Sequence, residues 1–303
     1  MNERSAEPAI FPPPGERTLV WAHRGYMSRA PQNTLAAFAL AWEAGADGIE
    51  LDAQRSADGH AVVFHDDTLD RLTDGTGAVA DRPLEYLRSL DAGSRFSGSF
   101  AGERIPLLAE VLSGRPKEGY VNVEIKTPLA SIPTLARLGR LFTGYPAMAN
   151  DGETERGKTA RLAAECVAET VRAAAARDRG LRARLIVSSF DPVALARFSE
   201  ILPEVPVGFL YCGNTKRDTR PLAFGTGNGQ RGILPVPPAA FHPAVRETSP
   251  SLIRREHAAG RRVHVWTVRN DLDALWLARS GADALIGNDP ARMLAALRRA
   301  GLR

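Results

Sequence analysis

The chain has 303 residues, of which 44% are apolar and 24% are charged, a balance typical of a globular protein with a sizeable core. The formal net charge is only +4, and the arginines are scattered rather than gathered in one stripe. A nucleic-acid partner is therefore not expected, although a mild positive field suits an anionic phosphate substrate. The two cysteines, Cys166 and Cys212, form neither a metal-ligand spacing nor a disulfide framework.

The first 18 residues, MNERSAEPAIFPPPGERT, are rich in proline and lack the apolar segment of a signal peptide. We expect them to form an extended or disordered arm. The sequence has no run of about 18 apolar residues, so no membrane span is expected. A cytoplasmic location is the default expectation.

Short apolar runs alternate with helical patterns along the rest of the chain, which indicates βαβ units and a parallel sheet. Eight such runs with helices between them predict an α/β fold, a single TIM (β/α)8 barrel spanning residues 19–303. The expected strands are Leu19–His23, Asp47–Asp52, Val121–Lys126, Leu185–Ser189, Val207–Tyr211, Gly232–Val236, Val263–Val268 and Ala284–Gly287.

The first helix has the clearest pattern. Asn33 is a suitable N-cap residue, and Gly45 is placed to end the helix in the C′ position. Between them, apolar residues recur at the spacing i, i+3, i+4, i+7 and make one stripe: Leu35, Phe38, Ala39 and Trp42.

About seventy residues separate the second and third expected strands, too many for a plain loop in a barrel. The turn signal Ser56–Gly59 is followed by the strand-like run Ala61–His65, which predicts a hairpin with the second strand. Residues of about 66–105 are rich in Gly, Asp and Ser. We expect them to form a small insertion over the top of the barrel.

Charged side chains stand where three expected strands end. His23 and Arg24 end the first strand, Glu50 and Asp52 share one face of the second, and Glu124 and Lys126 share one face of the third. Active sites of such barrels form at these strand ends. Three converging buried carboxylates need a compensating cation, and oxygen ligands favour Mg²⁺ or Ca²⁺. The sequence has no Cys or multi-His cluster of the kind that binds zinc.

The predicted hairpin brings a second histidine to the same rim, because reflection about the turn places His65 roughly opposite Asp52. His23 and His65 around a bound anion form a natural acid/base pair. Arg24 and Lys126 are either simple charge partners of the acids or clamps on phosphoryl oxygens, and the clamp role is favoured more for Arg24. His264 could lie in the core or line the site, and a substrate contact by His242 is a weaker alternative.

These residues resemble the glycerophosphodiester phosphodiesterase family. The resemblance runs from HRG and QNTLAAFALAWEAGADGIELD through HDDTLDRLTDGTG, VNVEIK, SSFD and VHVWTV to GADALIGNDP, over roughly residues 19–300. It implies a TIM barrel with a small inserted subdomain and a divalent metal held by Glu50, Asp52 and Glu124. It also implies His23 and His65 as general acid and base. The implied substrates are small glycerophosphodiesters, cleaved to glycerol 3-phosphate and an alcohol.

The resemblance further implies Arg24 and Lys126 at the phosphate and Trp266 beside the glycerol or alcohol. The sequence departs from the family pattern at Gln32, where glutamate is usual, and at Gly287–Pro290, where GNDP replaces TD.P. The second departure is expected near the substrate and indicates altered substrate choice. Two alternatives stay open: a related lyase that releases a cyclic phosphate, and a non-catalytic barrel that binds phosphodiesters.

Overall fold

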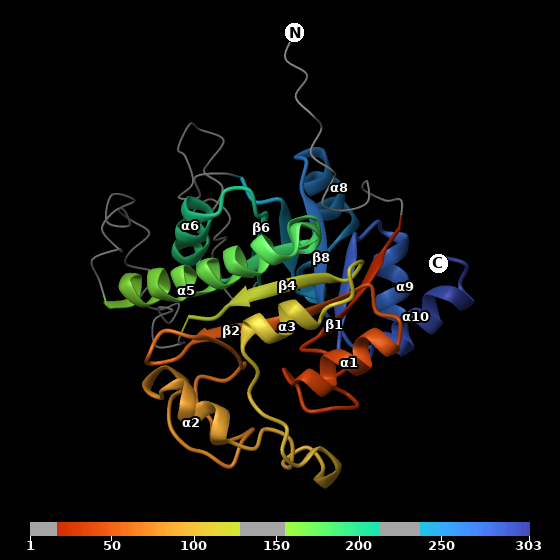
Figure 1. The fold of residues 1–303 in the computed structure, drawn as a ribbon. Coiled ribbons are helices and arrows are strands. Elements are labelled where there is room, and N and C mark those ends of the chain that lie inside the picture. The colour runs from red at the N-terminus through yellow and green to blue at the C-terminus, as the bar shows by residue number, and fades with distance from the viewer. Residues whose placement is uncertain (1–16, 128–154, 213–236) are drawn as a thin grey trace.

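The structure is a computed structural model that describes residues 17–127, 155–212 and 237–303. Within these residues, a nine-stranded sheet contains eight parallel strands and one strand, β3 (Ala61–Val63), that pairs antiparallel to β2. β1 pairs with β2 on one side and with β9 on the other, so the parallel strands close into a barrel. Figure 1 shows the helices outside this barrel. The predicted TIM barrel is confirmed.

Seven of the eight predicted strands are confirmed, with ends that differ by at most three residues. The eighth, Gly232–Val236, lies outside the described residues, and Ala240–Pro243 takes the place between the strands on either side. His242 therefore lies within a strand rather than after one. The barrel strands in spatial order are β1 (Leu19–His23), β2 (Gly48–Arg55), β4 (Tyr120–Ile125), β5 (Leu185–Ser189), β6 (Val207–Tyr211), β7 (Ala240–Pro243), β8 (Arg262–Val268) and β9 (Ala284–Gly287).

Helices follow the strands and cover the outside of the barrel, as the alternating pattern predicts. Several begin with a proline at the first turn after an Asp or Ser cap, which fixes where the chain turns back from the strand. The outer helices that the structure describes are α1 (Leu35–Glu43), α3 (Leu108–Gly114), α5 (Glu155–Arg177), α6 (Pro192–Ile201), α8 (Pro250–Ala258), α9 (Asp271–Arg279) and α10 (Pro290–Arg299).

The barrel strands are buried on both faces, as parallel strands between a core and a helix layer should be. Val20 and Val121 belong to the large cluster that packs against the helices. The alternate residues Trp21 and Tyr120 belong to a separate cluster inside the barrel. Since successive side chains of a strand point to opposite faces, residues two apart share the interior. Glu50 and Asp52 share one face of β2 by the same rule, as do Asn122 and Glu124 on β4.

The start of α1 differs from the sequence prediction. Thr34, not Asn33, caps the helix, because its side chain accepts a hydrogen bond from the backbone N–H of Ala37. Asn33 has a positive φ of 59° and its side chain points to β2 instead. Gly45, with φ of 80°, follows the C-cap residue as predicted.

The stretch between β3 and α3 contains the short helices η1 (Val79–Asp81), α2 (Leu84–Ser89) and η2 (Gly98–Phe100). It has a hydrophobic cluster of its own, which includes Phe64, Leu69 and Leu87. A separate small core supports the predicted insertion of about 66–105, whose boundaries stay a prediction. The other short helices among the described residues are η4 (Arg179–Arg184) and η5 (Val245–Glu247).

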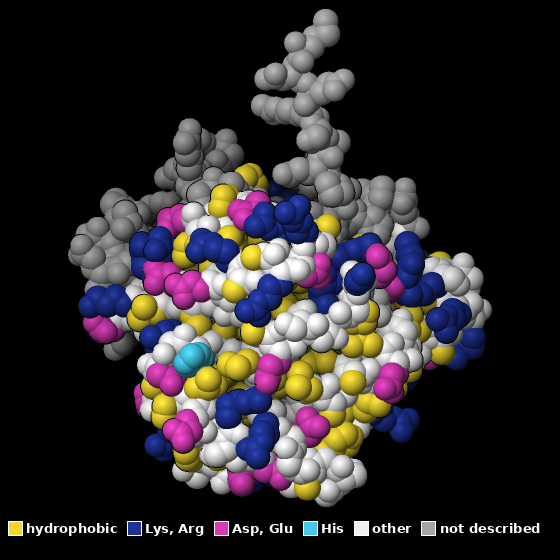
Figure 2. Space-filling view, in the orientation of Figure 1, with side chains coloured by type: hydrophobic (Ala, Val, Ile, Leu, Met, Phe, Trp, Pro, Cys, Tyr) yellow, Lys and Arg dark blue, Asp and Glu magenta, His cyan; other side chains and the backbone are white. Residues whose placement is uncertain are grey.

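The surface agrees with the scattered charge of the sequence. On the face drawn in Figure 2, basic and acidic side chains are interspersed, without a single basic stripe. Among the helices that the structure describes, none combines the length and the apolar character needed to cross a bilayer.

Alanine substitutions at two glycines are expected to change stability differently, because Gly208 is closely packed in the barrel and Gly114, at the end of α3, is not. A Cβ at Gly208 on β6 would lie 2.4 Å from Nε2 of His242, whereas a Cβ at Gly114 would meet nothing within 4 Å. Gly208→Ala is therefore expected to lower the free energy of unfolding by about 1–3 kcal/mol through overpacking. Gly114→Ala should leave it unchanged or raise it slightly. Urea denaturation of both variants tests this, and equal stabilities would contradict it.

Candidate active site

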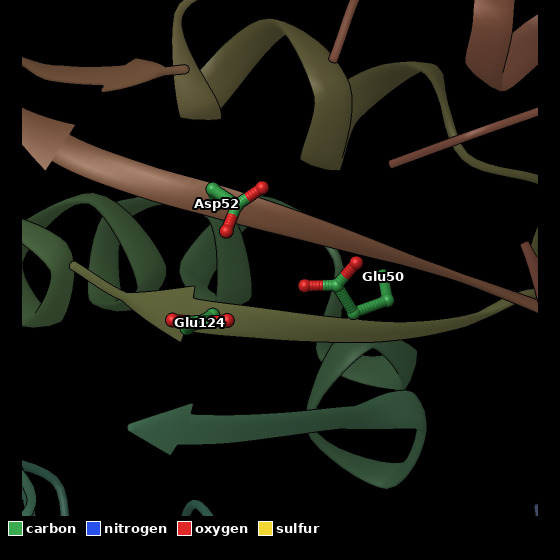
Figure 3. Close-up of side chains that lie close together, drawn as sticks. All are labelled: Glu50, Asp52 and Glu124. Carbon is green, nitrogen blue, oxygen red and sulfur yellow. The ribbon is translucent and has the colours of Figure 1, made fainter. Parts of the chain in front are cut away.

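Three buried carboxylates face one another between β2 and β4. Glu50, Asp52 and Glu124 each offer an oxygen within 4.8 Å of the others. Figure 3 shows the first two reaching from β2 and the third from β4. The strand register sets this arrangement, because Asp52 lies directly across from Glu124. The predicted convergence of the three acids is present in the structure.

Two cations pair with this acidic cluster. The Arg24 Nε lies 3.1 Å from Oδ2 of Asp52, and the Lys126 Nζ lies 3.0 Å from Oε1 of Glu124 and 3.6 Å from Oδ1 of Asp52. Burial alone would raise the pKa of Asp52, yet Arg24 and Lys126 together hold it below its usual range. Asp52 is therefore the carboxylate whose charge is best compensated.

Glu50 is the carboxylate with the least compensation. Burial raises its pKa well above the usual range, and the charges of Asp52 and Glu124 raise it further. Burial also raises the pKa of Glu124, although Lys126 opposes this effect. With only the protein's own cations present, the cluster carries one more acid than base, so it has room for additional positive charge.

The loop after β1 is wrapped around these acids. The backbone N–H of Arg24 donates to Oε2 of Glu50 at 3.1 Å. Nδ2 of Asn33 donates to Oδ2 of Asp52 at 2.8 Å, and the backbone N–H of Asp52 donates to Oδ1 of Asn33 at 3.3 Å. Gln32 accepts a hydrogen bond from Nη1 of Arg24 at 2.7 Å. Sequence reasoning missed these roles of Asn33 and Gln32, which depend on the positive φ values at Arg24 and Asn33.

His23 stands at the end of β1, beside the acids. Its Nδ1 donates to Oδ1 of Asn288 at 2.7 Å, which leaves Nε2 at 3.9 Å from Oε2 of Glu50. Burial, and next the charge of Arg24, lower the pKa of His23 to about 3. Asn288 belongs to the GNDP segment, so this departure from the family pattern touches a predicted catalytic histidine directly.

His65 reaches the same site from the hairpin. The pairing of Ala53 with Val63 places Phe64, not His65, across from Asp52, so the predicted register was wrong by one residue. The side chain of His65 nevertheless lines the site. Its Nδ1 donates to Oδ1 of Asp66 at 2.7 Å. Asp66 in turn accepts two hydrogen bonds, at 2.7 and 2.8 Å, from the guanidinium of Arg71.

A cavity opens between these groups. Its wall combines charged or titratable side chains, among them the two histidines, Arg24 and Lys126, with the aromatic rings of Phe190 and Trp266. The rings of Phe190 and Trp266 meet edge to face at 5.4 Å. Asp52 does not line the cavity. Its full lining is His23, Arg24, Glu50, His65, Asn122, Glu124, Lys126, Phe190, Leu210, Trp266 and Ile286.

Sequence reasoning missed four of these lining residues. Asn122 could have been found from its position two residues before Glu124, which places both on one face of β4. Phe190 directly follows the end of β5, where barrel active sites form. Leu210 and Ile286 have no polar signal and read as ordinary strand residues.

The two remaining strand histidines lie in the barrel core. His242 and His264 are fully buried, and Nδ1 of His264 lies 3.0 Å from Nε2 of His242. The ring of Trp21 lies 4.6 Å from the ring of His264. Neither histidine lines the cavity, so the core alternative for His264 holds and the substrate contact considered for His242 is not supported.

The fold and the site together define a (β/α)8-barrel enzyme with an acidic, histidine-containing pocket at the carboxyl ends of its strands. Comparison with known proteins specifies the class further. The profile of the Glycerophosphoryl diester phosphodiesterase family matches residues 23–137 and 143–292. The chain belongs to this family, and it is a phosphoric diester hydrolase.

Individual relatives agree with this assignment. The chain is 34% identical over 288 residues to a glycerophosphodiester phosphodiesterase of Caldanaerobacter subterraneus subsp. tengcongensis, covering 94% of this chain and 100% of the relative. It is 44% identical over 102 residues to human glycerophosphodiester phosphodiesterase 1, covering 33% of this chain and 31% of the relative. It also superposes with a TM-score of 0.73 on an Oleispira antarctica phosphodiesterase solved with the product sn-glycerol-3-phosphate, at 27% identity over 93% and 97% of the chains.

The buried histidine pair predicts a loss of stability in acid. Burial lowers the pKa of His242 to about 3 and the pKa of His264 well below its usual value. The unfolded chain therefore takes up protons below about pH 6.5 that the folded chain does not. Stability from the neutral pair is complete above that pH and is lost progressively as the pH falls below it.

Urea denaturation between pH 7.5 and 4.5 measures this slope. His242→Asn is expected to reduce the slope by roughly one proton per molecule. His60→Asn, at an exposed hairpin position, is the control and should keep the slope of the original protein. An unchanged slope in His242→Asn would show that this histidine takes up a proton in the folded state too.

Proposed function

We propose that the chain hydrolyses glycerophosphodiesters to glycerol 3-phosphate and an alcohol, with a divalent metal ion and a pair of histidines. The metal ligands are Glu50, Asp52 and Glu124. The observation that carries the proposal is the excess acid of this buried cluster beside two oriented histidines. The product named for the Oleispira antarctica enzyme supports the same reaction.

The residues present fit a hard divalent cation. All three ligands are carboxylates, which suit Mg²⁺ or Ca²⁺. Oδ1 of Asp52 is buried without a hydrogen-bond partner among the described residues, and burial together with the charges of Asp52 and Glu124 raises the pKa of Glu50. When bound, such an ion polarises a phosphoryl oxygen and supports the charge that develops there.

His23 and His65 are the proposed proton carriers. In each ring Nδ1 is committed to a partner, so Nε2 is the nitrogen left for substrate. One histidine removes a proton from the nucleophile, and the other protonates the departing alkoxide oxygen, which is a poor leaving group without that proton. The nucleophile is either water or the neighbouring glycerol hydroxyl, through a cyclic phosphate.

Arg24 is the proposed phosphate clamp, with Lys126 as its companion. The backbone of Arg24 holds Glu50 and its side chain lies between Asp52 and Gln32. Because Gln32 is neutral, it orients the guanidinium without cancelling its charge. The apolar wall of Phe190 and Trp266 faces the same cavity and suits the glycerol or alcohol part of the substrate.

Removal of either histidine is expected to lower kcat by about 10²–10⁴-fold, the usual scale of general acid–base catalysis. The assay measures glycerophosphocholine turnover by His23→Ala and His65→Ala. His60→Ala, on the same hairpin as His65 but exposed at its turn, is the matched control and should keep full activity. Activity within tenfold of the original protein in either site variant would refute the acid/base role of that histidine.

Removal of metal is expected to abolish turnover, and Mg²⁺ or Ca²⁺ should restore it. Glu124→Gln should require a higher metal concentration for half-maximal activity, because it removes one ligand charge. Glu85→Gln, an exposed change on α2, is the control. Full activity of a chelated, metal-free preparation would refute metal dependence.

Phosphorus NMR of the product distinguishes hydrolysis to glycerol 3-phosphate from release of a cyclic phosphate.

A further inference from the structure

Asn122 is a buried amide with unused hydrogen-bonding capacity. Its side chain is 1% exposed, and neither Nδ2 nor Oδ1 has a hydrogen-bond partner among the described residues. Each unsatisfied buried polar group costs free energy. Its neighbours in β4, Val121 and Val123, are apolar residues that favour a strand more than asparagine does. Packing alone therefore gives no reason for an amide here.

The position of Asn122 connects it to the acidic cluster. It lies directly across from Glu50 in the register of β2 and β4, and it shares a strand face with Glu124 two residues later. It also lines the cavity together with both glutamates. The unpartnered amide is thus placed at the wall of the space between two proposed metal ligands.

We propose that Asn122 belongs to the divalent-cation site, where its amide bonds to the cation directly or through a water held on it. An amide oxygen is a hard ligand of the kind that Mg²⁺ and Ca²⁺ accept, and an amide can also hydrogen-bond a bound water. This assignment rests on the metal site of the proposed function and adds a residue that the three carboxylates do not require.

The charge of the site explains why a neutral group suits this position. Three carboxylates with Arg24 and Lys126 leave one negative charge, and a divalent cation converts it to one positive charge. A phosphodiester anion then brings the site to neutrality. A fourth carboxylate would bind the cation more tightly but would oppose the anionic substrate. An amide adds a ligand and leaves this balance unchanged.

Two substitutions at this position test the assignment on the full-length protein. Asn122→Leu removes the amide and keeps the branched shape of the side chain, so Mg²⁺ and Ca²⁺ should bind about 10–100-fold more weakly in calorimetric titrations. In the metal-free protein the same change removes an unsatisfied group, so the unfolding temperature should rise by about 2–4 °C. Asn122→Asp should bind both ions at least as tightly as the original protein and raise the KM for glycerophosphocholine.

The opposite directions of these effects separate a metal role from a structural one. If Asn122 only supports the fold, Asn122→Leu would lower the unfolding temperature and leave metal affinity unchanged, and that result overturns the proposal. Ser199→Ala is the matched control, because this hydroxyl on α6 is also buried without a partner among the described residues but does not line the cavity. It should leave metal affinity unchanged.

Titration of the original protein with each ion comes first, because it separates failure of the metal site from failure of the role of Asn122. If the original protein binds neither Mg²⁺ nor Ca²⁺, the metal part of the proposed function fails, and this proposal fails with it. If the original protein binds an ion and both Asn122 variants bind it equally well, only the role of Asn122 is overturned. If Asn122→Leu weakens binding, terbium luminescence lifetimes in H₂O and D₂O count the water molecules on an ion bound at the site. One additional bound water in Asn122→Leu, relative to the original protein, indicates that Asn122 coordinates the ion directly.

Discussion

The buried excess of negative charge between β2 and β4 is the constraint on which the other features of the site depend. Burying a carboxylate without a partner is costly, and here three lie within 4.8 Å of one another. Arg24 and Lys126 compensate part of that charge, and their positions follow from it. The left-handed backbone at Arg24 and Asn33 brings one cation and one amide to Asp52, at the expense of the regular helix cap expected at Asn33.

The register between β2 and β4 aligns the polar side chains of the site. Asp52 stands across from Glu124, and Glu50 stands across from Asn122, so the barrel places two rows of polar side chains at adjacent levels. A slip of one residue between β2 and β4 would move these groups from the interior face to the helix layer. The large apolar cluster outside the barrel opposes such a slip, because Ile49, Leu51, Val121 and Val123 would then face inwards. The helix-facing core thus fixes the geometry of the acids.

Most of the fold and the centre of the site could be predicted because both follow from short-range periodicity. Strand alternation alone placed Glu50 with Asp52 and Glu124 with Lys126. Tertiary features could not be obtained this way. The strand Ala240–Pro243 has no apolar alternation of its own that separates it from the preceding Pro-rich run. The cap at Thr34 depends on a contact between Asn33 and Asp52, and the pairing of His242 with His264 depends on neighbouring strands.

The proposed roles of His23 and His65 depend on the side chains that orient their rings. Their ring orientation is set by two different segments of the chain, by Asn288 after β9 for His23 and by Asp66 after β3 for His65. Asp66 is itself held by Arg71, which belongs to the insertion. The segment after β3 therefore contributes to the site, because Arg71 donates to the carboxylate that orients His65. The Arg71–Asp66 interaction that orients His65 therefore comes from a segment outside the eight parallel strands.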